Sequence, residues 1–141
     1  MQQGRPSALI DRLRQAPIVH DRQQAERVLA ELAQAAQQAA VLAPLAASLQ
    51  RAPVRNLLAG IFGASPFLTA VIERDPERLL GALMATPEAH FDALCRTAEE
   101  GTVAAPNMAD AMRALRHFKT EVALLTALCD LGGVWPVIAS L

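Results

Sequence analysis

The sequence predicts an all-α fold: a compact array of about six to seven helices, several of them short, around a long C-terminal helix over residues 108–131. Apolar residues make up 52% of the 141 residues and aromatic residues only 4%, and tyrosine is absent. This composition, rich in alanine and leucine, favours helices packed through small side chains and disfavours sheet. A chain of this length can bury a real core. Residues 1–141 are therefore expected to form a single helical domain.

Short helices joined by tight corners are predicted in the middle of the chain. Ser65, Asp75 and Thr86 each precede a proline, and their side chains can accept a hydrogen bond from a first-turn N–H group. Gly63 and Gly101 suit the left-handed residue that ends a helix. The expected helices cover residues 7–16, 21–43 (with a bend at Pro44 and a continuation to 50), 54–62, 66–74, 76–85, 87–100 and 108–131.

The last long helix gives the strongest periodic signal. Asn107 is expected to cap it, with Asp110 three residues further on. Apolar residues then recur at steps of three and four and form one stripe: Met108, Met112, Leu115, Phe118, Val122, Leu125 and Cys129. A helix that is apolar over so much of its surface is expected to lie between other helices and to act as the spine of the fold.

Charge and cysteine content exclude several classes of protein. Thirteen basic and fourteen acidic residues give a formal net charge of −1, which argues against a general nucleic-acid binder. Cys95 and Cys129 form no CxxC pair, so a reduced, cytoplasmic protein with two buried thiols is expected. The N-terminus has no secretory signal. The uncharged stretch 32–50 is too rich in alanine and glutamine for a membrane span and predicts a buried or half-buried helix.

One arrangement resembles a catalytic motif, and we reject it. Gly63-Ala64-Ser65 followed by Asp75-Pro76-Glu77 resembles the Gly-Ser turn and paired carboxylates of nucleotidyltransferases. That pair needs a strand, on which side chains at i and i+2 face the same way and can hold Mg²⁺. Here the intervening residues 66–74 predict a helix, so Asp75 is better explained as a helix cap and Glu77 as a partner of the helix dipole.

The histidines likewise predict no catalytic or metal site. His90 and Cys95 are five residues apart, about 140° around a helix, with no further ligand nearby. His117 precedes Glu121 by one turn, which is typical of a surface pair.

A basic face on the last helix is the candidate contact site. Arg113 and Arg116 share this face with Thr120, and His117 and Lys119 lie beside it. The face could bind an acidic partner or a phosphate. A solvated surface opposite the apolar stripe is the structural alternative. Arg113, Arg116 and Lys119 are the candidate partner-contact residues, and no catalytic, cofactor-binding or metal-binding residue is predicted.

Two segments resemble a known family. Residues 57–79 read LLAGIFGASPFLTAVIERDPERL, and residues 115–136 read LRHFKTEVALLTALCDLGGVWP. Their order and spacing resemble the N-terminal helical region of the glutamine-synthetase adenylyltransferase family. The ending DLGGVWP is most similar to the alphaproteobacterial branch. The two segments cover about a third of the chain, and residues 1–56 have a compatible helical character.

The resemblance implies a specific function for a longer protein. Members of this family add AMP to a tyrosine of glutamine synthetase and remove it by phosphorolysis, in two nucleotidyltransferase halves that use ATP and Mg²⁺. Glutamine and the PII signalling protein switch between the two activities. The first Gly-Ser…Asp-x-Asp motif of the family lies beyond the point where this sequence ends. The resemblance therefore implies that residues 1–141 are a catalytically inert N-terminal fragment with glutamine synthetase and PII as partners.

Other functions remain open. The apolar run Trp135–Leu141 predicts that the natural chain continues, and a buried Trp135 that needs residues beyond Leu141 to cover it would favour the fragment. The alternative is a complete helical adaptor that binds a partner through the edge near Trp135 or through Arg113 and Arg116. A basic DNA-binding protein comes third and is disfavoured by the net charge.

Overall fold

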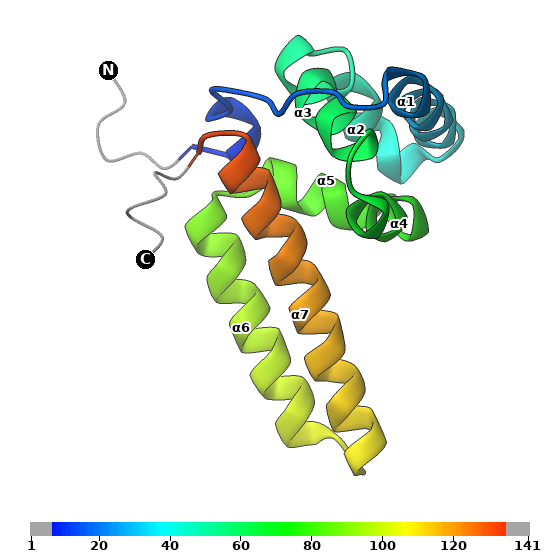
Figure 1. Ribbon diagram of the computed structural model, residues 1–141. Coiled ribbons are helices and arrows are strands. Elements are labelled where there is room, and N and C mark those ends of the chain that lie inside the picture. The colour runs from blue at the N-terminus through cyan, green and yellow to red at the C-terminus, as the bar shows by residue number, and fades with distance from the viewer. Residues whose placement is uncertain (1–6, 135–141) are drawn as a thin grey trace.

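The all-α prediction is confirmed. The structure, a computed structural model, describes residues 7–134, and every regular element within them is helical. In chain order (Figure 1) these elements are the 3₁₀-helix η1 (Leu9–Asp11), α1 (Arg22–Gln38), the 3₁₀-helix η2 (Ala40–Leu42), α2 (Ala43–Ser48), α3 (Ala52–Phe62), α4 (Pro66–Arg74), α5 (Pro76–Met84), α6 (Pro87–Ala104) and α7 (Met108–Leu131). Residues 135–141, and with them the prediction for Trp135, lie outside the described residues.

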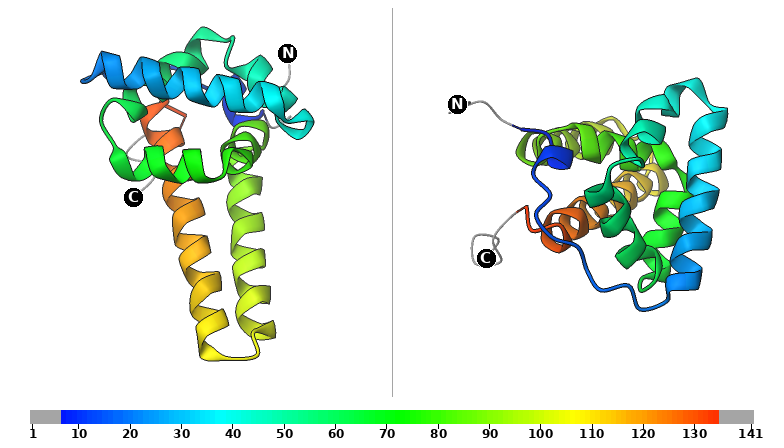
Figure 2. Two further views of the ribbon diagram at one scale, coloured as in Figure 1. Left: turned by 90° about the vertical axis from the view of Figure 1, so that its right-hand side faces the viewer. Right: turned by 90° about the horizontal axis from the view of Figure 1, so that it is seen from above.

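The described residues form two parts, a head and a hairpin. Helices α1–α5 and both 3₁₀-helices make the head, and the antiparallel pair α6 and α7 projects from it (Figures 1 and 2). We call the end of the hairpin near the α6–α7 connection distal and the end inside the head proximal. The largest fully buried side chains come from the head and from proximal α7: Leu9, Val28, Leu45, Leu57, Leu58, Ile61, Ile72, Leu79, Leu83, Leu124, Leu125 and Leu128.

Helix α7 has two different halves. Leu124, Leu125 and Leu128 are no more than 1% exposed, because this half of the helix packs against α4 and α5 in the head. Met108 is 76% exposed and Met112 46%, because the distal half packs against α6 and extends away from the head. The expectation that α7 lies between other helices is confirmed for the proximal half and wrong for the distal half.

An extended segment, residues 12–20, replaces the second half of the helix predicted for residues 7–16. We call it the strap, because it crosses the head from η1 to α1 (Figure 1). The N–H of Leu9 donates to the carbonyl of Ala85 at 2.9 Å, and the N–H groups of Arg14 and Gln15 donate to the carbonyl of Gly132 at 2.7 and 3.2 Å. In the predicted helix, these N–H groups would instead donate to carbonyl groups of the same helix. Tertiary hydrogen bonds therefore override the local helical pattern.

The strap can approach the head closely because glycines face it. A Cβ added to Gly60 of α3 would lie 2.1 Å from Cγ of Pro17, and one added to Gly132 would lie 2.6 Å from Cδ2 of Leu13. Gly133 has a φ of 70°, and the next N–H, that of Val134, donates to the carbonyl of Cys129 at 2.8 Å. This pattern is a Schellman motif, which ends α7 and turns the chain beneath the strap.

The predicted helix 21–43 ends earlier than expected. Asp21 caps α1 by accepting a hydrogen bond from the N–H of Gln24 at 3.0 Å, and the helix then stops at Ala39, whose backbone is extended. Pro44 explains the break, because a proline inside a helix removes a hydrogen bond and clashes with the preceding turn. It lies instead in the first turn of α2. The uncharged stretch 32–50 is thus divided among the end of α1, η2 and α2. None of the helices in the described part of the chain combines the length and hydropathy needed to cross a bilayer.

The local helix signals are confirmed in part. Helices α4, α5 and α6 each begin at the predicted proline, but of the three predicted caps only Ser65 accepts a first-turn hydrogen bond, from the N–H of Leu68 at 3.2 Å. The left-handed predictions for Gly63 and Gly101 are wrong. Gly63 ends α3 with a φ of −84°, and Gly101 lies inside α6.

A nearly buried ion pair links the hairpin to the head. Nε of Arg78 in α5 and Oε1 of Glu121 in α7 form this pair, and their side chains are only 11% and 13% exposed. Arg78 also donates to the carbonyl of Val71 in α4 at 3.4 Å. Removing one partner of a buried pair typically costs about 3–5 kcal/mol, because the other charge is left unpaired. The pair therefore fixes the angle and register at which α7 enters the head.

We expect Gly60→Ala to destabilise the fold by roughly 1–3 kcal/mol, because the added methyl group overlaps Pro17 of the strap. The matched control is Gly81→Ala, in α5, where the nearest atom to the added Cβ is Cε1 of His90 at 4.0 Å. That change should be neutral or stabilising by up to about 1 kcal/mol, since alanine favours a helix over glycine. Urea denaturation followed by circular dichroism measures both. Equal stability of the two variants would contradict the close approach of the strap.

Candidate functional site

The hairpin carries the candidate contact residues on a closely packed pair of helices. A Cβ added to Gly101 of α6 would lie 3.3 Å from Cβ of Ala114 in α7. Gly101 therefore remains inside the helix, where it lets α7 approach, instead of ending α6 as predicted. Helix α6 depends on this contact, since Pro87 is its only residue in the buried class. An amphipathic helix gains most of its stability from the surface that it buries.

All three predicted contact residues lie on α7 and are exposed. Arg113 donates to Oδ1 of Asp110 at 2.6 Å, so its charge is already partly matched. Within the described residues, the side chains of Arg116 and Lys119 take part in no ion pair. Asp110 also supplies the N–H that Asn107 caps at 2.8 Å, which confirms the predicted start of the helix. The basic character of this face therefore comes mainly from Arg116 and Lys119.

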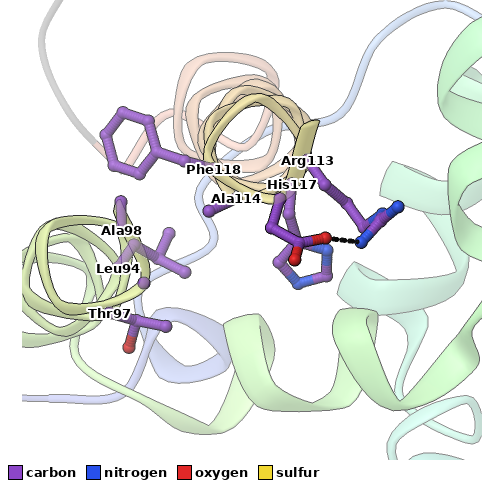
Figure 3. A pocket seen from close by; sticks show the side chains of 9 residues that line it. Leu94, Thr97, Ala98, Arg113, Ala114, His117 and Phe118 are labelled. Carbon is purple, nitrogen blue, oxygen red and sulfur yellow. Dashed lines mark hydrogen bonds and ion pairs between the residues drawn. The ribbon is translucent and has the colours of Figure 1, made fainter. Parts of the chain in front are cut away.

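A groove runs along the side of the hairpin between the two helices (Figure 3). It has a volume of about 440 Å³ and is lined by Leu94, Thr97, Ala98, Gly101, Asp110, Arg113, Ala114, His117 and Phe118. Figure 3 shows the rings of Phe118 and His117 on two different sides of α7, with the side chain of Arg113 on the same side as His117. The sequence analysis missed this groove. The small residues Ala98, Gly101 and Ala114 were its only signal, because they leave space between two helices.

The predicted surface pair of His117 and Glu121 is wrong. Glu121 turns towards the head and pairs with Arg78, where both side chains are almost buried. His117 is exposed and lines the groove instead. Residues one turn apart can form a pair on an isolated helix, but a guanidinium from another helix in a nearly dry position attracts the carboxylate more strongly.

Carboxylate, histidine and cysteine side chains are scattered over the described part of the chain. The described residues contain no group of three or more His, Cys, Asp or Glu side chains that could hold a metal ion. Asp75 ends α4 and Glu77 lies in the first turn of α5, and the helix Pro66–Arg74 separates them from Ser65 as predicted. Asp75 and Glu77 therefore do not lie on a strand, the element that would align two carboxylates on one ion.

The two cysteines differ in their surroundings. Both are free thiols; Cys129 is buried, but Cys95 in α6 is only half-buried, so the prediction of two buried thiols is wrong for Cys95. Burial raises the pKa of Cys129 from 9.0 to about 12; the charge of Arg12 opposes this rise, and those of Glu88 and Asp130 add to it. The thiol of Cys129 is therefore held in its neutral form as part of the core.

Comparison with known proteins decides the family. The family model described as "Glutamate-ammonia ligase adenylyltransferase" matches residues 55–141, more than half of the chain. The chain belongs to this family. Much of the matched region within the described residues consists of α3–α7, so the family signature covers the hairpin and the helices that anchor it. No solved structure matches the chain.

Relatives of the adenylyltransferase family extend the match to the strap and α1. A bifunctional glutamine synthetase adenylyltransferase/adenylyl-removing enzyme of Rhodopseudomonas palustris (strain BisB5) is 41% identical over 94% of this chain and 13% of its own length. The enzyme of the same name from Bradyrhizobium diazoefficiens is 50% identical over 60% of this chain and 8% of its own. The enzyme of this name from Xanthobacter autotrophicus is 38% identical over 96% of this chain and 13% of its own length. The chain thus spans about an eighth or less of these relatives, which are alphaproteobacterial, as the ending DLGGVWP predicted.

At pH 8, we expect a thiol reagent to modify Cys95 in the folded chain and to reach Cys129 only after unfolding, because the thiolate is the reactive form. Unfolding returns the pKa of Cys129 to about 9. Burial of the neutral thiol therefore stabilises the fold fully below pH 9, and this contribution is lost as the pH rises towards 12. Iodoacetamide labelling followed by mass spectrometry measures both sites. Cys95→Ser should remove the native-state reaction, whereas rapid native labelling of Cys129 would contradict its burial.

Proposed function

We propose that this chain is the N-terminal helical region of a bifunctional enzyme that adenylylates and deadenylylates glutamine synthetase, and that the region itself is catalytically inert. The observation that carries the proposal is the family membership, together with relatives whose printed names give both activities. Because the chain spans 8–13% of those three relatives, the nucleotidyl-transfer chemistry is assigned to the rest of the longer polypeptide. There, carboxylates would hold Mg²⁺ and position ATP for in-line attack.

The proposed cellular role follows from the same resemblance. Glutamine synthetase is the substrate, its modified group is a tyrosine, and the PII protein and glutamine set the direction of the reaction in the cytoplasm. The region described here would brace the catalytic part or contact a protein partner. Residues 1–141 would act as one helical domain of a multidomain enzyme. Their architecture suits this division, since the described residues offer a projecting hairpin.

A specific observation favours one alternative, a stand-alone helical interaction module. The distal half of the hairpin exposes large apolar side chains, such as Met108 at 76%, as expected of a protein that binds through them. The two functions differ in whether an enzyme continues beyond this sequence. The alternative of a basic DNA-binding protein has no comparable support, because the net charge is −1.

We expect the gene to continue in frame past the Leu141 codon into a Gly-Ser…Asp-x-Asp motif. The polypeptide that it encodes, with ATP and Mg²⁺, should transfer labelled AMP to a tyrosine of purified glutamine synthetase, and phosphate should release it. Residues 1–141 alone should transfer none. A stop codon directly after Leu141, or transfer by the short chain alone, would contradict the proposal; the stop codon would leave the interaction module as the function.

A further inference from the structure

The distal hairpin exposes apolar side chains that a helix pair would normally cover. Val103, close to the α6–α7 connection, is 83% exposed, and Met108, Met112 and Leu115 on α7 are 76%, 46% and 41% exposed. The last three follow the i, i+4, i+7 spacing of one helix face. Further along the helix, Leu124 and Leu128 are no more than 1% exposed. Exposure is therefore concentrated on the part of α7 that lies beyond the head.

Of the unmatched basic residues of α7, Arg116 lies beside this apolar stripe and Lys119 follows it, in line with the stripe and one turn after Leu115. At 100° per residue, Lys119 lies about 20° from Met108 around the helix and Arg116 about 80°. The acidic residues Asp110 and Glu121 lie about 200° and 220° away, on the other side. We call the surface formed by Met108, Met112, Leu115, Arg116 and Lys119 the outer face of α7. It combines apolar anchors with positive charge and contains no carboxylate.

The acids of this part of α7 do not neutralise the outer face. Asp110 pairs with Arg113, and Glu121 pairs with Arg78 of the head. Arg116 and Lys119 therefore have charge available for a partner. Their positive charge is local, because the whole chain carries a formal charge of −1. A local field of this kind selects a partner by its own charge pattern.

We propose that the outer face of α7 docks an acidic, amphipathic helix of a partner protein. Apolar residues at i, i+4 and i+7 match the anchors of a second helix, and Arg116 beside the stripe and Lys119 at its end would meet carboxylates of that helix. Duplex nucleic acid fits poorly, because the centre of the face is apolar. A second copy of this chain also fits poorly: in a two-fold contact the face would meet an identical face, which offers no carboxylate to pair with Arg116 or Lys119. The proposal does not depend on the activity proposed above.

The test uses the whole chain and a synthetic probe. The probe is a fluorescent 20-residue helical peptide with leucines at i, i+4 and i+7 and glutamates on both flanks of that stripe. Fluorescence anisotropy should detect binding that weakens as salt rises, because the flank contacts are ionic. A peptide with the same composition in scrambled order, and one with lysines in place of the glutamates, should each bind at least about tenfold more weakly.

Variants locate the binding on the chain. Arg116→Glu and Met112→Asn, both at exposed positions, should each weaken the acidic peptide at least about fivefold and leave the helix content unchanged by circular dichroism. Arg22→Glu, the same charge reversal at an exposed position of α1, should not change the affinity.

Three results would overturn the proposal. The first is no binding of the acidic peptide, or equal binding of the scrambled one. The second is an equal loss of affinity with Arg22→Glu, which would indicate a general charge effect. The third is self-association of the chain that sedimentation detects and Met112→Asn abolishes, which would make a second copy the occupant of the face.

Discussion

The fold depends on the contact between the strap and the end of α7. The carbonyl of Gly132 accepts hydrogen bonds from the N–H groups of Arg14 and Gln15, and the strap then crosses α3 at Gly60. This contact joins the first and last described parts of the chain. It also holds the proximal end of α7 between the strap and the helices of the head. Without it, the hairpin would be attached to the head by side-chain packing, by the Arg78–Glu121 pair and by the ion pair of Arg12 with Glu88 of α6.

Anchoring at one end explains why the hairpin can serve as a contact element. Proximal α7 buries its leucines in the head, so the distal half of the hairpin is presented at a fixed angle without being covered. A rigid element with an exposed apolar and basic face meets a partner at a low entropic cost, because little must be ordered on binding. Under the proposed function, such an element would position domains or partners, and the chemistry would take place in the rest of the longer polypeptide.

Local signals made much of the fold predictable. Helices α4 and α7 have the predicted bounds, because Ser65-Pro66 and Asn107 act within one turn of the residues that they cap. The strap was unpredictable, since the carbonyl that accepts its hydrogen bonds, that of Gly132, lies far along the sequence, and these bonds override a local apolar pattern. The break of α1 at Ala39 was misplaced for a related reason: Pro44 acts on the turn that precedes it.

The positions of the candidate contact residues around α7 were predictable, and the surroundings of these residues were not. Periodicity places Arg116 and Lys119 on one side of α7, whereas the stripe from Met108 to Cys129 has the same pattern whether it is covered or exposed. Only the tertiary structure shows that the head covers the proximal half of this stripe and leaves the distal half of α7 exposed. The same limit applies to Glu121, whose partner belongs to another helix and not to its own.

Amide hydrogen exchange in the native state tests the anchored-hairpin account most directly. The account predicts that amides of α3 and of residues 124–131 exchange only through global unfolding, because both segments lie in the core beneath the strap. Amides of residues 97–117, in the distal hairpin, should exchange through local opening at a clearly lower free energy. Equal protection along the whole of α7 would contradict the account, because it would mean that the distal hairpin is held as firmly as the head.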